Sequence, residues 1–365
     1  MNILNWLSPQ KGPVILAPLA GVSDHPFRRI CTKHGADLTY VEMISATALL
    51  YESRRTYDML KRHESEERLG VQITGKTADE TAAAIKLLAE MNFETIDINM
   101  GCPVKKVVKT GCGSAILKDP ARVFETVEKS RAVCSKPLSV KIRIGWDRAN
   151  INTRTVTKAA EDAGADWITI HGRTREDDYS VPVNLNELRE TKEQAAIPVI
   201  GNGNIFSRND AHEMMSKSQV DGVMVSRGAL GNPWVFADIK GRQEPVHIDE
   251  WFDTVSQHLA WQLEEYGDRG MSAICMRKHL LWYTKGWPSG KKARETINKT
   301  QTIAEAKEVL GKFYEEQRHS DHVFRHQVQL DGAGRFDWDP KYEMDRVHDR
   351  GGDYQYDQAA NAPQP

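Results

Sequence analysis

Short apolar segments alternate with helix-like segments from residue 14 to about residue 240. The apolar segments are mostly continuous runs of Val, Ile and Leu, which is typical of strands buried on both faces. They are VILAPLA (14–20), LTYVEMI (38–44), LGVQITG (69–75), TIDINMG (95–101), LSVKIRIG (138–145), WITIHGR (167–173), PVIGNGN (198–204) and GVMVSRG (222–228). Eight strands, nearly all separated by one helix, predict an α/β fold of the (β/α)8 or TIM-barrel type. The alternative, an open doubly wound sheet, usually has fewer strands and carries a G-x-G-x-x-G turn after the first, where this chain has APLAG (17–21).

Capping signals predict helices between the strands. Thr77, Asp119 followed by Pro120, and Ser207 each precede a helical pattern, and Gly164 ends another. The predicted helices span 77–91, 119–133, 152–164 and 207–218. A single barrel needs ~250 residues, so this chain of 365 residues has room for a second unit.

The strand pattern stops after residue 240. Apolar residues then recur at helical spacing over 248–267, 271–286 and 295–317, which predicts a small all-α domain. Residues from about 319 onward are polar, Asp- and Gly-rich and aperiodic, which is typical of a mobile tail. The predicted organisation is a catalytic barrel over 1–240, a helical domain over 241–318 and a tail over 319–365.

Cysteine usage and hydropathy exclude several classes of protein. The five cysteines are odd in number, scattered and form no C-x-x-C pair, which disfavours a disulfide framework or a structural zinc site and fits a reducing cytoplasm. The N-terminus lacks a charged segment followed by an apolar one, so no signal peptide is expected. No apolar run approaches the ~20 residues that span a bilayer. We expect a cytoplasmic monomer with no metal ion and no membrane contact; the net charge of −2 neither favours nor excludes an anionic partner.

Polar residues end nearly every predicted strand. In a barrel, functional groups lie at the C-terminal ends of the strands, so these side chains should converge on one mouth. The residues at these strand ends are Pro18, Gln72, Asn99 with Cys102, Lys141, Arg143, His171, Arg173, Asn202, Asn204, Ser226 and Arg227. A loop-capping role explains any single one, whereas the set favours a ligand site.

The last two strands indicate what the ligand is. GNGN (201–204) and SRGALG (226–231) are Gly-rich turns, and the second leads toward a helix at Asn232-Pro233. Backbone N–H groups together with Arg227 predict a phosphate cradle, although tight turns alone would explain either loop. Lys141 would then stand near N1 and C2=O of an isoalloxazine, and Gln72 could bond its edge. FMN, with one phosphate, fits this arrangement better than a dinucleotide.

Cys102 follows the fourth predicted strand. A cysteine with an ordinary pKa of about 8.5 is mostly protonated at neutral pH, which suits a proton donor to carbon as well as a nucleophile. Pairing Cys102 with His171 would give a papain-like hydrolase, which would leave the flavin-like site unexplained. A buried structural cysteine is the other alternative.

Basic residues predict an RNA partner. Lys105, Lys106 and Lys109 follow Cys102, and residues 276–299 carry seven cationic side chains against one Glu. Predicted RNA contacts in this second segment are Arg277, Lys278, Lys285 and Arg294. Trp282, Tyr283 and Trp287 are interleaved with them, and cations with stacking rings suit an RNA backbone and an extruded base. A solvated helix face with core aromatics is the alternative.

These residues closely resemble the tRNA-dihydrouridine synthase family, in particular its bacterial B-type subgroup, over about residues 12–315. The motifs that carry the resemblance are APLAG with SDHPFR (17–28), VQITG (71–75), INMGCP (98–103), KTGCGSA (109–115), VKIRIG (140–145), IHGRT (170–174), GNGNI (201–205), SRGALGNPW (226–234) and RKHLLWYTKG (277–286). The resemblance implies an FMN-dependent barrel with a helical tRNA-binding domain. It also implies Cys102 as the proton donor and FMN contacts at Pro18, Leu19, Ala20, Gln72, Lys141, His171, Asn202, Gly203, Asn204, Ser226 and Arg227.

The implied reaction is NAD(P)H-driven reduction of a uridine C5=C6 bond in tRNA. Hydride would pass from the flavin to C6, and Cys102 would protonate C5 of a uridine extruded from the RNA fold. Two rival functions are a flavoenzyme that reduces a free pyrimidine and a non-catalytic RNA-binding protein. The same chemistry on ribosomal RNA is a further variant.

Overall fold

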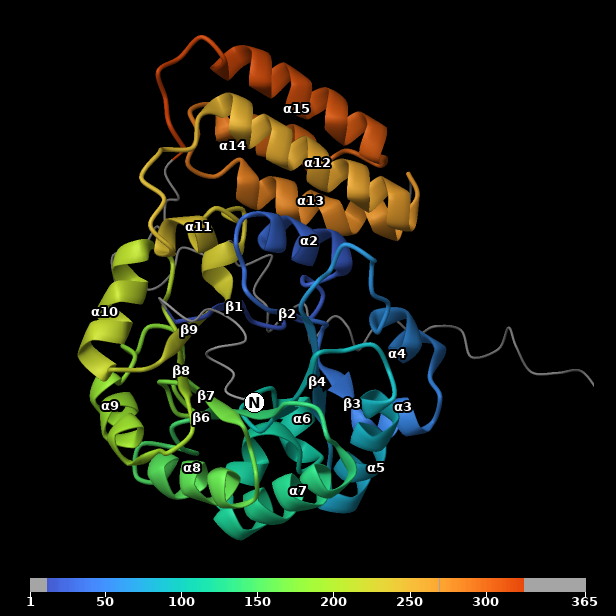
Figure 1. The fold of residues 1–365 in the computed structure, drawn as a ribbon. Coiled ribbons are helices and arrows are strands. Elements are labelled where there is room, and N and C mark those ends of the chain that lie inside the picture. Colours follow the sequence, from blue (N-terminus) through green and yellow to red (C-terminus); the bar gives the residue numbers. More distant parts are fainter. Residues whose placement is uncertain (1–11, 269, 325–365) are drawn as a thin grey trace, which may run out of the picture.

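The computed structural model describes residues 12–268 and 270–324, so most of the predicted tail, 325–365, lies outside the described part. Its strands are β1 (Val14–Leu16), β2 (Thr39–Tyr40), β3 (Ile44–Ser45), β4 (Leu69–Thr74), β5 (Thr95–Asn99), β6 (Leu138–Arg143), β7 (Trp167–His171), β8 (Val199–Asn202) and β9 (Gly222–Val225). All pair in parallel, in the order β1-β9-β8-β7-β6-β5-β4-β2, with β3 beside β4. The N–H of Leu16 donates to the carbonyl of Leu38 at 2.9 Å, which joins the two ends of the sheet. The predicted (β/α)8 barrel is confirmed (Figure 1).

The second predicted strand is broken into β2 and β3. Tyr40 pairs with Gly70, and Ile44 pairs with Ile73. Between these two pairs the chain advances by four residues in the β2–β3 segment but by only three in β4. One extra residue interrupts the ladder there, as in a β-bulge. The irregular segment between the two strands carries Glu42, which reaches the loop after β1.

Helices cover the outside of the barrel. They are α2 (His25–Lys33), α3 (Ala46–Leu50), α4 (Arg54–Met59), α5 (Ala78–Ala89), α6 (Lys105–Lys109), α7 (Pro120–Val133), α8 (Thr153–Asp162), α9 (Leu185–Gln194), α10 (Arg208–Ser218) and α11 (Val235–Ile239), with the 3-10 turns η1 (Gly113–Lys118) and η2 (Arg227–Ala229). The side chains of Thr77, Asp119 and Ser207 accept hydrogen bonds from N–H groups in the first turns of α5, α7 and α10, which confirms the predicted caps. The helix expected from Pro233 begins two residues later, at Val235.

Large side chains fill the barrel interior below the mouth. Ile15, Leu38, Tyr40, Trp167 and Met224 belong to one buried apolar cluster inside the strands. A second and larger buried cluster lies around it and includes side chains of the surrounding helices. The barrel is therefore closed at this level by packed side chains, and a ligand can enter only from the mouth.

Among the residues described after α11, the chain forms four more helices. They are α12 (Ile248–Tyr266), α13 (Met271–Tyr283), α14 (Gly290–Ile297) and α15 (Ile303–Gln317). The segment 295–317, which has apolar residues at helical spacing, contains parts of two helices. A turn at 298–301 separates α14 from α15, and Thr302 caps α15 by accepting from the N–H of Glu305 at 3.1 Å. These helices share an apolar core in which the ring of Trp251 lies 5.8 Å from that of Trp287. The boundaries at 240/241 and 318/319 stay predictions.

The helix α2 joins the barrel to the C-terminal helices. Its His25 Nε2 lies 2.7 Å from a carboxylate oxygen of Glu265 in α12, and the guanidinium of Arg29 lies 3.9 Å from the centre of the Trp261 ring. Figure 1 shows α12 and α13 stacked against the barrel on the side of α2 and α11. The loop that leads into α2 comes directly from the barrel mouth, so this contact lies beside the candidate site.

Candidate active site

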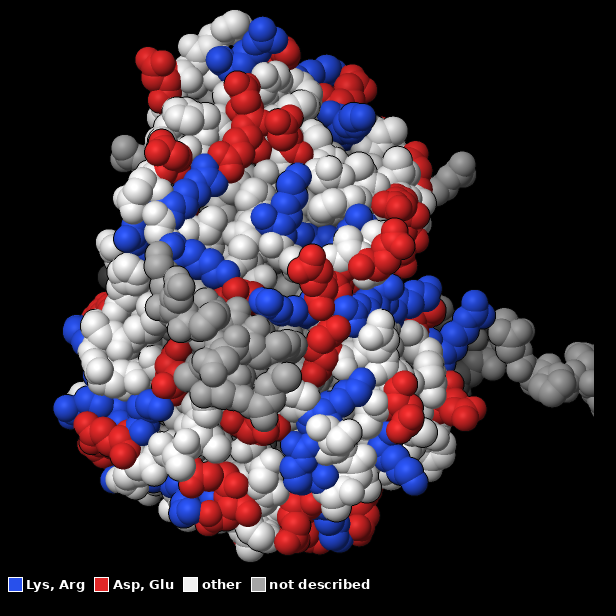
Figure 2. Space-filling view, viewed as in Figure 1, with Lys and Arg blue, Asp and Glu red and all other residues white. Residues whose placement is uncertain are grey.

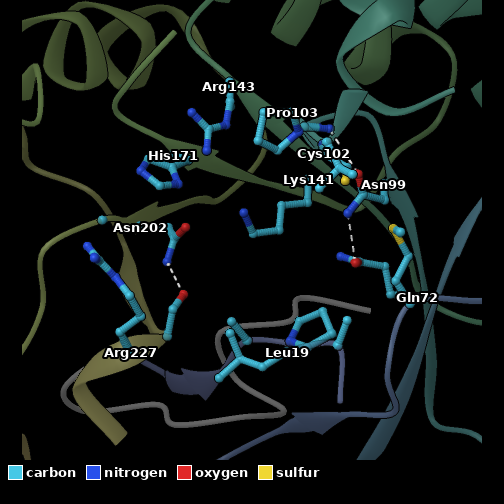
Figure 3. A pocket seen from close by; sticks show the side chains of 18 of the residues that line it. Leu19, Gln72, Asn99, Cys102, Pro103, Lys141, Arg143, His171, Asn202 and Arg227 are labelled. Atoms are coloured by element: carbon cyan, nitrogen blue, oxygen red, sulfur yellow. Dashed lines mark hydrogen bonds between the residues drawn. The ribbon is translucent and has the colours of Figure 1, made fainter. Parts of the chain in front are cut away.

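A cavity opens at the C-terminal ends of the strands. The structure brings all the predicted cofactor-binding residues and Cys102 to its wall (Figure 3). The wall contains Pro18, Leu19, Ala20, Gln72, Cys102, Lys141, His171, Asn202, Gly203, Asn204, Ser226 and Arg227. Residues 18 and 227 are far apart in sequence, but β1 and β9 are neighbours, so barrel closure makes these residues adjacent.

A chain of amide hydrogen bonds fixes the position of Cys102. Asn99 Oδ1 accepts from the backbone N–H of Cys102 at 2.9 Å, and Asn99 Nδ2 donates to Gln72 Oε1 at 2.8 Å. Gln72 Nε2 then donates to Asp97 Oδ2 at 2.7 Å. The orientation of both amides is therefore set by the buried carboxylate, and the turn that carries the half-buried Cys102 is attached to the strands β4 and β5.

The loop after Cys102 is packed closely behind it. The carbonyl of Cys102 accepts from the N–H of Ser114 at 3.1 Å. Gly113 has a φ of +57°, and a Cβ there would lie 2.8 Å from the Cys102 carbonyl oxygen. Only glycine fits this position without a shift of the backbone. The lysines predicted to follow Cys102 lie on the short helix α6, and all three are exposed.

Lys141 belongs to the wall of the cavity, and the buried carboxylate of Asp97 lies behind the wall, where it accepts from Gln72. Burial lowers the pKa of Lys141 to about 8, with a further decrease from Arg143, while Asp97 and Cys102 oppose the shift. Burial likewise raises the pKa of Asp97 to about 6, opposed by hydrogen bonds from Ser139 and Gln72. In the described part of the chain, no group accepts a hydrogen bond from the Lys141 ammonium, which points into the cavity (Figure 3). A half-buried cation without an acceptor is a ready site for an anionic or carbonyl ligand atom.

His171 is held neutral. Burial lowers its pKa well below the ordinary value, and the surrounding cations Arg143, Lys141 and Arg173 lower it further. Its Nε2 lies 3.3 Å from a guanidinium nitrogen of Arg173. A neutral imidazole beside several cations offers a hydrogen bond to a ligand, whereas the imidazolium of a cysteine–histidine ion pair would be disfavoured here.

The loops after β8 and β9 form the other end of the cavity. Gly203 and Asn204 have φ values of +119° and +51°, so the backbone turns sharply there. Arg227 donates to Asn204 Oδ1 at 3.4 Å, and its guanidinium lies 3.6 Å from the centre of the Tyr179 ring. Among the described residues, nothing accepts from the backbone N–H of Asn204 or Gly228. These donors and Arg227 are suited to a phosphate group.

The charges of the wall have one sign. It contains Lys141, Arg143 and Arg227 but no Asp or Glu among its described residues. The sequence places Arg143 at a strand end without assigning it to the ligand. Tyr179 comes from the loop after β7 and reaches the wall although no sequence motif marks it. The cavity therefore selects for an anionic ligand.

The predicted RNA contacts are in two groups with different surroundings. Lys105, Lys106 and Lys109 project from α6 near the mouth. On the C-terminal helices, three of the four cations donate to backbone carbonyls. Arg277 donates to the carbonyl of Asn298 at 3.0 Å, and Arg294 donates to the carbonyl of Thr284 at 3.1 Å. Lys278 donates to the carbonyl of Gly21, and Lys285 is half-buried. Figure 2 shows Lys and Arg gathered along the boundary between the barrel and these helices.

The interleaved aromatic residues are not a stacking surface. Tyr283 is fully buried and Trp287 is 6% exposed, and both belong to the apolar core of the C-terminal helices. The Trp251 indole N–H donates to the carbonyl of Tyr283 at 3.0 Å inside this core. The expectation that these rings stack on RNA bases is wrong for Tyr283 and Trp287, because both rings pack inside the apolar core of the C-terminal helices.

Known proteins are similar to this chain over most of its length. A family model described as "Dihydrouridine synthase (Dus)" matches residues 15–318. The tRNA-dihydrouridine synthase B of Pseudomonas putida is 39% identical over 315 residues, which are 84% of this chain and 93% of that protein. The tRNA-dihydrouridine synthase B of Pasteurella multocida is 37% identical, covering 82% and 91%, and a probable tRNA-dihydrouridine synthase of Rickettsia prowazekii is 36% identical, covering 82% and 94%. Of the helices in the described ranges, none has the length and apolarity needed to cross a membrane.

Proposed function

Since the chain belongs to the dihydrouridine synthase family and resembles its B-type members, we propose that it reduces the C5=C6 bond of specific uridines in tRNA to 5,6-dihydrouridine. The proposed cofactor is FMN and the proposed reductant NADPH or NADH. The observation that carries the proposal is a cationic cavity with no carboxylate in its described wall and one thiol at its edge.

The residues present fit FMN. Arg227 and the backbone N–H groups of Asn204 and Gly228 would hold the phosphate, since these N–H groups have no acceptor among the residues that the structure describes. Lys141 and Gln72 would hold the ring edge, Lys141 as a cation and Gln72 as an amide whose direction is set by Asp97. When bound, FMN would accept electrons from NAD(P)H and supply a hydride to C6 of the uracil ring.

Cys102 would supply the proton. Transfer of the Sγ proton to C5 completes the reduction, because one hydride and one proton together saturate the C5=C6 bond. The thiolate that remains is stabilised by the charge of Lys141, which interacts electrostatically with Cys102. Solvent then returns a proton to Sγ. Asn99, which binds the backbone of Cys102, keeps the thiol at the mouth, where an extruded base can reach it.

The exposed lysines of α6 would guide the RNA backbone to this thiol. Phosphate contacts make affinity fall with salt, with a slope of roughly 0.7–0.9 per contact. Replacing the α6 lysines by Gln is expected to reduce the slope for tRNA by about two and leave flavin content unchanged. A matched triple change to Gln on the outer helices, at Lys86, Lys158 and Lys217, controls for net charge. Equal slopes in both variants would remove α6 from the RNA path.

The test of the function is direct. The purified full-length chain should release FMN on denaturation and, with NADPH, form dihydrouridine in tRNA that lacks it. Free uridine and a ribosomal RNA fragment should not react. A reaction on free uridine alone would support the free-pyrimidine reductase, a reaction on ribosomal RNA alone the other RNA target, and a flavin-free protein that binds RNA the non-catalytic alternative.

A further inference from the structure

The loop after β1 is held from outside the barrel. Its residues Leu19 and Ala20 line the cavity, and Gly21 follows with a φ of +68°. The N–H of Gly21 donates to Glu42 Oε2 at 2.6 Å, and its carbonyl accepts from the Lys278 ammonium of α13. Both backbone groups of one residue are therefore bonded to side chains from two other elements.

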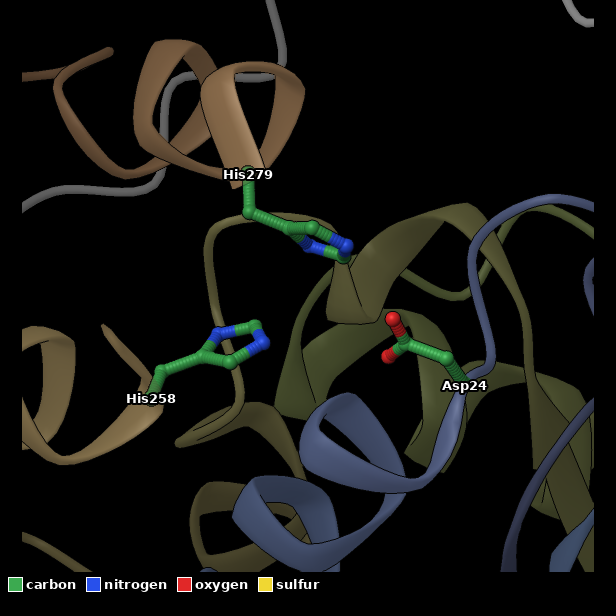
Figure 4. Close-up of side chains that lie close together, drawn as sticks. All are labelled: Asp24, His258 and His279. Carbon is green, nitrogen blue, oxygen red and sulfur yellow. The ribbon is translucent and has the colours of Figure 1, made fainter. Parts of the chain in front are cut away.

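Lys278 interacts electrostatically with two carboxylates near this loop, Asp24 and Glu42. Asp24 caps α2 by accepting from the N–H of Phe27 at 3.2 Å, and Lys278 partly offsets the burial that raises the pKa of Asp24 and Glu42. Figure 4 shows Asp24 facing His258 and His279 of α12 and α13. Burial and Lys278 lower the pKa of both histidines, so neither of them supplies a second positive charge.

The same helix also supports the loop after β9. Gly231 has a φ of +67°, and a Cβ there would lie 2.4 Å from the carbonyl carbon of Trp282. Trp282 follows Lys278 by four residues, so both contacts come from one face of α13. This face therefore contacts two of the loops that reach the cavity, on either side of the junction between β1 and β9.

We propose that Lys278 is a positioning residue for the cofactor pocket: its ammonium holds the Gly21 carbonyl so that Leu19 and Ala20 keep their places in the wall. The inference rests on the proposed function in that the pocket is taken to bind FMN. It assigns Lys278 an inward role in place of the RNA contact expected from the sequence. Loss of a hydrogen bond from a charged donor is expected to lower the affinity of the pocket for its ligand about ten- to a hundredfold, because the loop that this bond holds contacts the ligand.

The test compares Lys278→Met with Lys291→Met, an exposed lysine of α14. Three quantities are measured: the Kd of FMN by fluorescence, amide exchange of residues 19–24 in the flavin-free protein, and the salt dependence of tRNA binding. Lys278→Met should weaken FMN binding about ten- to a hundredfold and speed exchange in 19–24, with the salt slope unchanged. Lys291→Met should leave the first two quantities at wild-type values, and Lys278→Arg should restore them to within about threefold.

The opposite pattern would overturn the inference. Wild-type FMN affinity and exchange in Lys278→Met, with a salt slope lower by about one, would make Lys278 an RNA contact. If Lys278→Met does not fold, Lys278→Gln, which keeps a donor without the charge, is expected to change FMN binding and exchange in the same direction. A wild-type protein that binds no FMN would refute the proposed function alone, since loop exchange is measured without flavin.

Discussion

Replacing Lys141 by Met is expected to stabilise the flavin-free protein while it weakens FMN binding. Burial lowers the pKa of Lys141 from 10.5 to about 8, so the folded protein carries a cation that its surroundings disfavour. At 1.36 kcal/mol per pKa unit, this corresponds to about 3 kcal/mol at pH 7, reduced by whatever screening water provides in the cavity. Met keeps most of the aliphatic stem and removes the charge.

The pH dependence follows from the same shift. Between pH 8 and pH 10.5 the unfolded chain retains a proton that folded Lys141 has lost, so wild-type stability rises with pH relative to the variant. The stability gained by Lys141→Met should therefore be largest below pH 8 and disappear by about pH 10.5. FMN affinity of the wild type should fall as pH rises above 8, because the flavin-free pocket loses its cation.

Urea unfolding of the two flavin-free proteins at pH 7 and at pH 10 measures this difference. Lys86→Met, at an exposed position on α5, is the matched control and should change stability by less than about 0.5 kcal/mol. A variant that is less stable than wild type at pH 7, or a gain that does not depend on pH, would refute the electrostatic reasoning.

Two further predictions concern the support of the site. Glu66→Ala should lower the free energy of unfolding by about 3–5 kcal/mol, because the buried guanidinium of Arg28, whose Nε lies 2.7 Å from Glu66 Oε1, would lose its counter-ion. A free energy of unfolding within about 1 kcal/mol of the wild-type value, measured with urea, would contradict this. Gly231→Ala should lower stability by about 1–3 kcal/mol, because the residue has a positive φ and the added Cβ would meet the backbone of Trp282. Gly311→Ala, inside α15, should raise stability by up to about 1 kcal/mol, because the added Cβ would have no atom within 4 Å among the described residues. Equal melting temperatures for the two alanine variants would argue against the tight contact at Gly231.

The barrel and the composition of its mouth were predictable because both follow from local pattern. Continuous runs of Val, Ile and Leu between helix signals identify the strands, and parallel closure brings their C-terminal ends together. Gln72, Lys141 and His171 could therefore be assigned to one cavity without knowledge of any distance. Cys102 lies at the edge of that cavity for the same reason.

Features that depend on register or on distant partners were not predictable in this way. The break between β2 and β3 arises from one extra residue, which only the pairing with β4 reveals. The inward contact of Lys278 joins residues 257 positions apart. The separation of α14 from α15 did have a signal, since Thr302 and Glu305 have the spacing of a capping box.

The most direct test of the account is the rate of dihydrouridine formation by Cys102→Ala, with Cys112→Ala as the matched control. Both variants should contain FMN and bind tRNA as the wild type does. Dihydrouridine formation by Cys102→Ala should fall by about 10²–10⁴-fold, the usual contribution of a general acid, while Cys112→Ala stays near the wild-type rate. Formation of dihydrouridine by Cys102→Ala at the wild-type rate would contradict the proposed role of the thiol.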